Sequence, residues 1–124
     1  MTKQLSSTVN VKAELRLRVL RVLDKHPHFT QRQLASELNV SLGAVNYVVN
    51  ALVQRGSVKV NNFRKSGNKV GYLYVLTAKG FVEKTSLATA FLGRKLEEYE
   101  MLKEEIENLK GEVDSAGSGK EAKS

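Results

Sequence analysis

The chain of 124 residues has no cysteine and no tryptophan, and Pro27 is its single proline. Without cysteine, disulfide bonds and thiolate metal ligands are excluded. The two histidines, His26 and His28, share one turn and lack Cys or carboxylate companions at ligand spacing, so we expect no metal and no cofactor. No hydrophobic run approaches the roughly 20 residues of a membrane-spanning helix, and no signal-peptide pattern follows Met1. The composition therefore predicts one modest, cytoplasmic globular domain.

The residue patterns of common catalytic sites are missing as well. The sequence has no glycine-rich phosphate-binding loop and no paired carboxylates in a pocket pattern. Serines and threonines are present, but none lies beside a candidate base in a strand-to-helix elbow. We therefore expect no catalytic residues and no enzymatic activity.

Charge is abundant and unevenly distributed. The formal net charge is +7. Residues 1–90 carry 14 Lys and Arg against 4 Asp and Glu, whereas residues 91–124 carry 6 against 9. A basic body favours a polyanionic partner such as nucleic acid, and the acidic end needs a different role.

The stretch SLGAVNYVVNALVQRG, residues 41–56, has the most informative pattern. Its valines recur with Leu52 at the spacing of one helix face, which predicts a buried stripe. Ser41 can cap the first turn, and Gly56 suits the left-handed residue that follows a helix. The opposite face is polar but uncharged, which favours close approach to a surface and hydrogen bonds to base edges; an ordinary surface helix is the alternative. This face carries Gly43, Asn46, Tyr47, Asn50 and Gln54.

A second helix is predicted immediately before this one, over residues 31–38. Thr30 and Gln33 have the spacing of a capping box, and Phe29 can pack on Leu34 as a hydrophobic staple. A turn of three residues follows. Two short helices joined by such a turn, the second with an uncharged polar face, form a helix-turn-helix.

The N-terminal part is predicted to contain one more helix, over residues 12–25. Leu17 and Leu20 lie off its main apolar stripe and need another element to cover them. Pro27 ends this helix, because proline lacks an N–H and restricts the residue before it. Residues 1–11 are polar and uncapped, so we expect a flexible arm there.

After Gly56 the apolar pattern changes to a period of two. Residues 57–63 (SVKVNNF) and 70–76 (VGYLYVL) flank the turn residues RKSGNK, which predicts a β-hairpin. Beside a helix-turn-helix, we interpret this hairpin as a wing that contacts phosphates. A hairpin with a solvated tip is the alternative. The tip carries Arg64, Lys65 and Lys69.

Thr77 can cap a further helix near the C-terminal end. Gly93 costs about 1 kcal/mol relative to Ala inside a helix, so the sequence leaves open whether this helix bends or breaks there. Residues 114–124 are rich in Gly, Ser and Lys and are expected to be disordered. The residues expected to pack inward are Phe81, Ala88, Phe91 and Leu92.

From Arg94 the sequence is rich in Glu and Lys, with apolar residues at heptad spacing. Glutamates at g and lysines at e pair as Glu98 with Lys103′ and Glu105 with Lys110′, which predicts a parallel two-stranded coiled coil. The alternative is an amphipathic helix that folds back on its own domain. Lys95 occupies a d position of the heptad, where a charged residue is unfavourable. The core columns, and hence the expected dimerisation residues, are Leu92, Tyr99, Ile106 and Val113 at a, with Leu102 and Leu109 at d.

The run QRQLASELNVSLGAVNYVVNALVQRGSVKV, followed by VLTAKG, resembles the MarR family of bacterial transcriptional regulators. The longer run SLGAVNYVVNALVQRGSVKVNNFRKSGNKVGYLYVLTAKG, with the tail RKLEEYEMLKEEIENLK, is similar to the short group of that family associated with exopolysaccharide loci. The resemblance covers about residues 14–113. It implies a winged helix-turn-helix in the bacterial cytoplasm, associated with the nucleoid.

This resemblance further implies sequence-specific binding of double-stranded DNA by a homodimer, with the recognition helix in the major groove and the wing near the minor groove or backbone. The chain lacks the long helix that usually precedes the first helix of the family and helps to form an effector pocket. The resemblance therefore does not extend to a small-molecule effector. By position, DNA contacts would come from Ser41, Gly43, Asn46, Tyr47 and Asn50, from the second helix start at Thr30, Gln31 and Arg32, and from Arg64, Lys65 and Lys69 in the wing.

We therefore predict a mainly α (α+β) fold, a winged helix-turn-helix with a two-stranded β wing and a C-terminal coiled-coil helix. The expected function is transcriptional regulation by a homodimer on a pseudo-palindromic operator, with exopolysaccharide biosynthesis genes as candidate targets. One alternative is a winged-helix protein-interaction module in which Tyr47 and the wing meet an acidic partner. Another is a coiled-coil adaptor that binds nucleic acid without choosing a sequence. The expected parts are an arm at 1–11, a DNA-binding domain at 12–92, a dimerisation helix at 93–113 and a tail at 114–124.

Overall fold

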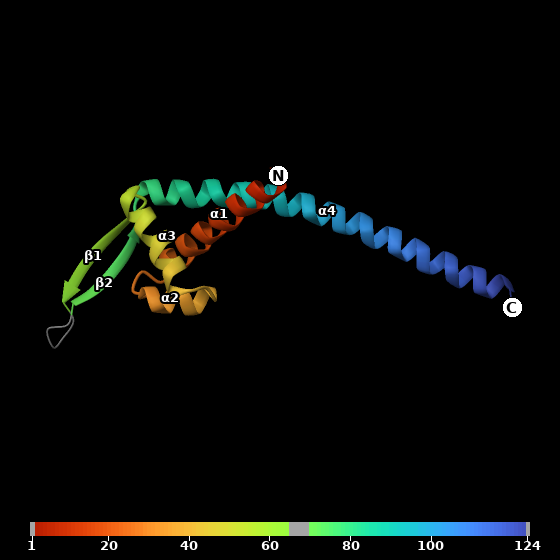
Figure 1. Ribbon diagram of the computed structural model, residues 1–124, viewed down its shortest axis with the longest axis horizontal. Helices are drawn as coiled ribbons and strands as arrows, with labels where there is room; N and C mark the ends of the chain where they lie inside the picture. Colours follow the sequence, from red (N-terminus) through yellow and green to blue (C-terminus); the bar gives the residue numbers. More distant parts are fainter. Residues whose placement is uncertain (1, 65–69, 124) are drawn as a thin grey trace. The chain divides into compact units, whose positions relative to one another are not determined.

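The computed structural model describes residues 2–64 and 70–123, which form helices and one hairpin (Figure 1). The chain divides into two compact units, Met1–Thr89 (unit 1) and Ala90–Ser124 (unit 2), and the division falls within the last helix. A helix-turn-helix followed by a two-stranded antiparallel sheet and a helix confirms the predicted fold class. The elements are α1 (Thr2–Lys25), α2 (Gln31–Leu38), α3 (Leu42–Gln54), β1 (Val58–Arg64), β2 (Val70–Leu76) and α4 (Ala78–Lys123).

The apolar stripe of α3 lies at the centre of unit 1. Val45, Val49 and Leu52 are at most 1% exposed, which confirms the predicted buried face. They share one cluster with buried residues of α1, α2 and the hairpin, among them Leu20 and Leu34. Full burial of one such side chain contributes roughly 1.5–3 kcal/mol, so the stripe fixes the rotation of α3 about its axis. The polar face of α3 is thereby turned outward.

Local capping determines where α2 and α3 begin. The Thr30 hydroxyl accepts a hydrogen bond from the Gln33 N–H at 3.1 Å, and the Gln33 side chain accepts one from the Thr30 N–H at 2.8 Å. Ser41 Oγ accepts a hydrogen bond from the Ala44 N–H at 3.1 Å. Between the two helices Asn39 has a φ of 55°, a left-handed conformation that Asn adopts more readily than most residues. The predicted capping box and helix-turn-helix are confirmed.

The hairpin is anchored to the helices on one face. Val58 pairs with Leu76 at its base, and both side chains are buried with Tyr74 in the core of unit 1. The Tyr74 N–H donates to the Pro27 carbonyl at 3.0 Å. This hydrogen bond ties β2 to the loop between α1 and α2.

A close backbone contact positions the start of α4. A Cβ at Gly80 would clash with the Ser57 carbonyl oxygen, so only glycine fits there. Thr77 Oγ1 accepts from the Gly80 N–H at 3.1 Å and donates to the Gly56 carbonyl at 2.6 Å, which confirms the predicted cap. Gly56 itself has a φ of 75°, as expected for the residue that follows α3.

The inward face predicted for α4 is partly wrong. Gly80 is buried and Leu87 packs against the core of unit 1, so they define the face of α4 that turns inward. Phe81 lies beside that face and is 46% exposed. In unit 2, Leu92 is 59% exposed.

Both segments that were expected to be irregular are helical in the structure. α1 begins at Thr2, and α4 continues through Gly93 and on to Lys123. Neither proline nor glycine interrupts residues 2–11, and isolated glycines cost a helix only about 1 kcal/mol each. Over the described residues, the structure therefore replaces the expected arm at 1–11 and tail at 114–124 with helix.

Candidate nucleic-acid interface

The outer face of α3 is accessible and uncharged. Ser41, Gly43, Asn46 and Asn50 are exposed, and Tyr47 is 68% exposed. The buried stripe on the other side of α3 holds this face toward the outside of unit 1. All five residues predicted for the recognition helix therefore lie on one accessible surface.

The first turn of α3 exposes its backbone. An added Cβ at Gly43 would have only Ser41 Oγ within 4 Å, at 4.0 Å, so packing within the chain does not require glycine there. Ser41 is the N-cap, and its hydroxyl keeps a proton to donate while its oxygen accepts from Ala44. This turn can therefore approach another surface closely and offer it a hydrogen-bond donor.

Three amide side chains and one phenol form a continuous hydrogen-bonded chain beside this face. Asn50 Nδ2 donates to Asn46 Oδ1 at 3.0 Å, and Asn46 Nδ2 donates to Gln31 Oε1 at 2.9 Å. Gln31 Nε2 then donates to Tyr74 Oη at 3.3 Å. We call these four residues the amide chain. It links α3, α2 and β2, and it restricts the orientation of the two asparagines on the outer face.

The start of α2 lies next to the amide chain. Gln31 is half-buried and takes part in the amide chain, whereas Thr30 and Arg32 are exposed. Thr30 Oγ1 already accepts the capping hydrogen bond of α2. Arg32 is thus the exposed cation of the three residues predicted here.

The wing is only partly within the described residues. The backbone of Arg64 ends β1. The Arg64 side chain, Lys65 and Lys69 lie outside the described residues, so the predicted phosphate contacts of the wing stay a prediction. On the described part of β1, Lys59 is exposed.

A carboxylate joins the far end of α3 to α4. Glu83 pairs with the Arg55 guanidinium and accepts a hydrogen bond from Ser57 Oγ at 2.6 Å. Arg16 Nη1 of α1 lies 3.7 Å from the same carboxylate, whose side chain is 13% exposed. Lys79 Nζ also donates to the Arg55 carbonyl, at 2.6 Å. The C-terminal end of α3 is therefore held by charged groups rather than by apolar packing alone.

A hollow of about 460 Å³ lies between α1 and α3 in unit 1. Apolar side chains dominate its lining, and Tyr47 of the outer face forms part of it. The other residues around the hollow are Val11, Lys12, Leu15, Arg16, Ala44, Val48, Ala51 and Arg55.

Within residues 2–64 and 70–123, the His, Cys, Asp and Glu side chains form no group of three or more that could hold a metal ion. In the same part of the chain, none of the helices has the length and apolar character needed to cross a membrane.

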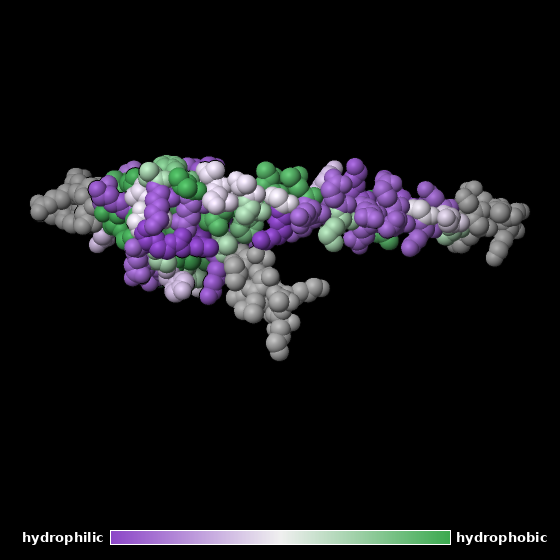
Figure 2. Space-filling model, turned by 90° about the horizontal axis from the view of Figure 1, so that it is seen from above, coloured by the Kyte–Doolittle hydropathy of each residue, from purple (hydrophilic) through white to green (hydrophobic). Residues whose placement is uncertain are grey.

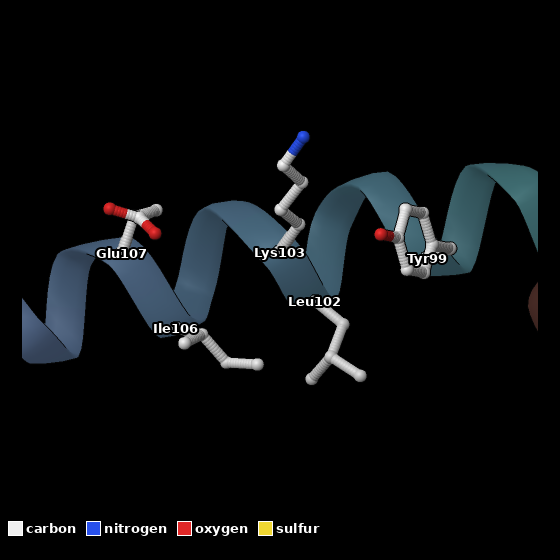
Figure 3. A pocket seen from close by; sticks show the side chains of 5 residues that line it. All are labelled: Tyr99, Leu102, Lys103, Ile106 and Glu107. Atoms are coloured by element: carbon white, nitrogen blue, oxygen red, sulfur yellow. The ribbon is translucent and has the colours of Figure 1, made fainter.

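Unit 2 carries an apolar stripe whose side chains are exposed. Figure 2 shows hydrophilic residues over much of α4 with hydrophobic ones between them. Leu102 and Ile106 project from the same side of the helix, whereas Lys103 and Glu107 point to the opposite side (Figure 3). A shallow hollow of about 140 Å³ lies among these side chains and Tyr99. The predicted core columns are all exposed, by 42% at Ile106 and by more at Leu92, Tyr99, Leu102, Leu109 and Val113.

A comparison of the sequence with known protein families indicates the class of domain. Residues 12–59 match the family described as winged helix-turn-helix DNA-binding. The matched segment runs from α1 through α3 into β1, so it contains the outer face of α3 and most of the amide chain. No curated protein matches the sequence.

Solved structures with this fold include a MarR family transcription regulator, with a TM-score of 0.57 and 14% identity over 77% of this chain and 66% of that one. The adhesin competence repressor AdcR from Streptococcus pyogenes has a TM-score of 0.53 and 23% identity, covering 82% of this chain and 77% of its own. ZitR from Lactococcus lactis, in an apo form, has a TM-score of 0.55 and 20% identity, covering 82% and 74%. These similarities show a shared winged helix-turn-helix fold. The chain spans about two thirds of the length of the first of these proteins.

For two residues of this region, the sequence predicted no role in the site. Tyr74 was predicted only as part of a hairpin strand, and no role was predicted for Glu83. Their roles depend on partners far along the chain, Gln31 for Tyr74 and Arg55 for Glu83. Helical or strand periodicity carries no information about such pairs.

Proposed function

We propose that the protein is a sequence-specific transcriptional regulator that binds double-stranded DNA as a homodimer. The observation that carries this proposal is the outer face of α3, where Asn46 and Asn50 are exposed yet held in the amide chain. Asparagine can form two hydrogen bonds with adenine in the major groove, and orientation before binding lowers the entropic cost of that contact. In a winged helix-turn-helix, this is the face that enters the groove.

The basic composition of residues 1–90 supports DNA as the partner. Phosphate contacts supply much of the affinity of DNA-binding proteins, but they carry no sequence information. On this surface the uncharged amides of α3 would specify the bases. Arg32, Lys59 and the basic residues of the wing would bind the backbone. This division of roles is the one expected of a regulator rather than of a non-specific nucleic-acid-binding protein.

The exposed stripe of unit 2 supports a homodimer with parallel helices. Two apolar columns at heptad spacing would be buried against a second copy. In a parallel pair, Glu98 and Glu105 face Lys103′ and Lys110′. In an antiparallel pair, g positions face g′ positions and would bring glutamates together. A two-fold dimer would bind a pseudo-palindromic operator whose half-sites are separated by about one turn of DNA.

The resemblance of residues 14–113 to the MarR family, and within it to the exopolysaccharide-associated group, extends the proposal to the target genes. The structural similarity to a MarR family transcription regulator supports the fold that this resemblance implies. We propose that the operators lie near exopolysaccharide biosynthesis genes. We propose no small-molecule effector for this protein.

The experiment that tests the function is selection of DNA fragments, from genomic DNA and from a random duplex library, by the purified protein. A sequence-specific regulator enriches a motif with two related half-sites, and excess random DNA does not displace it from that motif. An adaptor that binds nucleic acid without choosing a sequence would bind both pools equally and lose all binding to the random competitor. A protein-interaction module would bind neither pool. Enrichment only of loci unrelated to exopolysaccharide synthesis would contradict the proposed target genes alone.

A further inference from the structure

The two asparagines of α3 occupy different positions in the amide chain. Asn46 lies in the middle of the amide chain, with Nδ2 donating to Gln31 and Oδ1 accepting from Asn50. Asn50 lies at the end of the chain, and its hydrogen bond in the chain uses only one N–H of Nδ2. An asparagine side chain has two N–H donors and one carbonyl oxygen with two lone pairs. The whole Asn50 carbonyl and its second N–H are therefore free of the amide chain.

This difference matters for base recognition. A bidentate contact with adenine needs one N–H donor for N7 and one carbonyl lone pair for the N6 amino group, both on the same amide. Asn50 has both groups available in its observed orientation. Asn46 also keeps one N–H and one lone pair, but hydrogen bonds at both ends of its amide fix the direction in which these remaining groups point. Because Asn50 Nδ2 donates to Asn46, the Asn50 oxygen is the end of the amide that has no partner in the amide chain.

Tyr74, the inner end of the amide chain, is fixed in the core of unit 1. The Tyr74 ring is 9% exposed and packs in the core cluster. Its N–H is tied to the Pro27 carbonyl. Its hydroxyl oxygen therefore has a defined position, from which it accepts the hydrogen bond of Gln31 at 3.3 Å. Through these hydrogen bonds Tyr74 positions Gln31, Gln31 positions Asn46, and Asn46 positions Asn50.

We propose that Asn50 is the residue that recognises an adenine in each half-site, and that Asn46, Gln31 and Tyr74 are positioning residues that orient its amide. This inference rests on the proposed DNA-binding function and assigns one base and one residue within it. Asn50 donates Nδ2–H to adenine N7 and accepts from the adenine N6 amino group. The Tyr74 hydroxyl acts at a distance, through two intervening side chains.

The test uses the full chain, the motif selected from the random duplex library, and the same duplex with 7-deazaadenine at single adenine positions. 7-Deazaadenine lacks the N7 acceptor but keeps Watson–Crick pairing. At one adenine of each half-site, the substitution should weaken binding of the unaltered protein by about 5- to 150-fold. Asn50→Ala should weaken binding to the unmodified motif by a similar factor and should be insensitive to 7-deazaadenine. Affinity for random DNA should stay unchanged.

Tyr74→Phe separates positioning from contact. It keeps the buried ring and removes only the oxygen that accepts from Gln31. We expect it to reduce the preference for adenine over guanine at the Asn50 position several-fold while the protein stays sensitive to 7-deazaadenine. Tyr72→Phe is the matched control, because Tyr72 is on the same strand, is 54% exposed and has no part in the amide chain. Thermal unfolding of each variant verifies that the fold is retained.

Each outcome supports or overturns a stated part. A motif without a preferred adenine, or loss of 7-deazaadenine sensitivity in Asn46→Ala but not in Asn50→Ala, overturns the assignment of Asn50. Unchanged base preference in Tyr74→Phe, with the expected loss in Asn50→Ala, overturns the positioning role alone. If the protein selects no motif at all, the proposed function fails before this inference is reached.

Discussion

The guanidinium of Arg55, the C-cap residue of α3, pairs with the carboxylate of Glu83 on α4. The same carboxylate accepts a hydrogen bond from Ser57 Oγ and lies near Arg16 of α1. Glu83 therefore joins the end of the candidate recognition helix to two other helices within unit 1. It is the one acidic residue among these four, so the arrangement depends on its charge.

We predict that Glu83→Gln lowers the free energy of unfolding by about 1–3 kcal/mol, because hydrogen bonds to a charged group are lost while the side-chain shape is kept. Urea unfolding monitored by circular dichroism measures the effect. Glu97→Gln on the exposed surface of α4 makes the same chemical change and should alter stability by less than about 0.5 kcal/mol. Equal effects in the two variants would show that the Glu83 contacts do not stabilise the fold.

Gly43→Ala should separate stability from DNA binding. Alanine has space at this position and favours a helix over glycine by up to about 1 kcal/mol, so thermal stability should not fall. The added methyl group would lie between α3 and the DNA, and operator affinity should fall at least several-fold in a titration with labelled duplex. Gly93→Ala is the control, since it also adds a methyl in open space but in unit 2. Undiminished operator affinity in Gly43→Ala would mean that the first turn of α3 does not approach DNA closely.

The wing prediction concerns salt dependence. Each phosphate contact contributes about −0.9 to the slope of log K against log salt concentration. Arg64→Ala/Lys65→Ala should therefore give a shallower slope and weaken specific and random DNA alike. The control Lys120→Ala/Lys123→Ala removes the same charge from the C-terminal end and should leave the slope unchanged. The wing contact is refuted if the two double variants have the same slope.

The dimer prediction depends on the heptad register. Ile106 occupies a central core position, and Ile106→Asp would place a charge at the apolar seam from each copy. Sedimentation velocity should show a dimer for the unaltered chain and a monomer for the variant, with the circular dichroism of a folded protein in both. Operator binding by the variant should lose its dependence on half-site spacing. Asn108→Asp adds the same charge outside the seam and should stay dimeric. An unaltered chain that is monomeric at micromolar concentration, or a dimeric Ile106→Asp, contradicts this register.

Features that depend on neighbouring residues could be predicted from the sequence alone. The capping box of Thr30 and Gln33 spans one helical turn, and the buried stripe of α3 is a repeat of three and four positions. Turn residues between two alternating runs likewise defined the hairpin. Because each feature is formed within a short segment, the order of the elements and the outward face of α3 could be predicted without the fold.

Contacts between distant polar groups, in contrast, depend on how the elements pack. Gln31 and Tyr74 are separated by 43 positions, and Ser57 and Glu83 by 26, so no local pattern marks either pair. The inward face of α4 was likewise decided by the close approach of Gly80 to the Ser57 backbone, which left Phe81 exposed against expectation. The distinction between Asn46 and Asn50 has the same origin. Their residue type and helix face are properties of the sequence, whereas the partners that engage both ends of the Asn46 amide and one end of the Asn50 amide come from the packing of three elements.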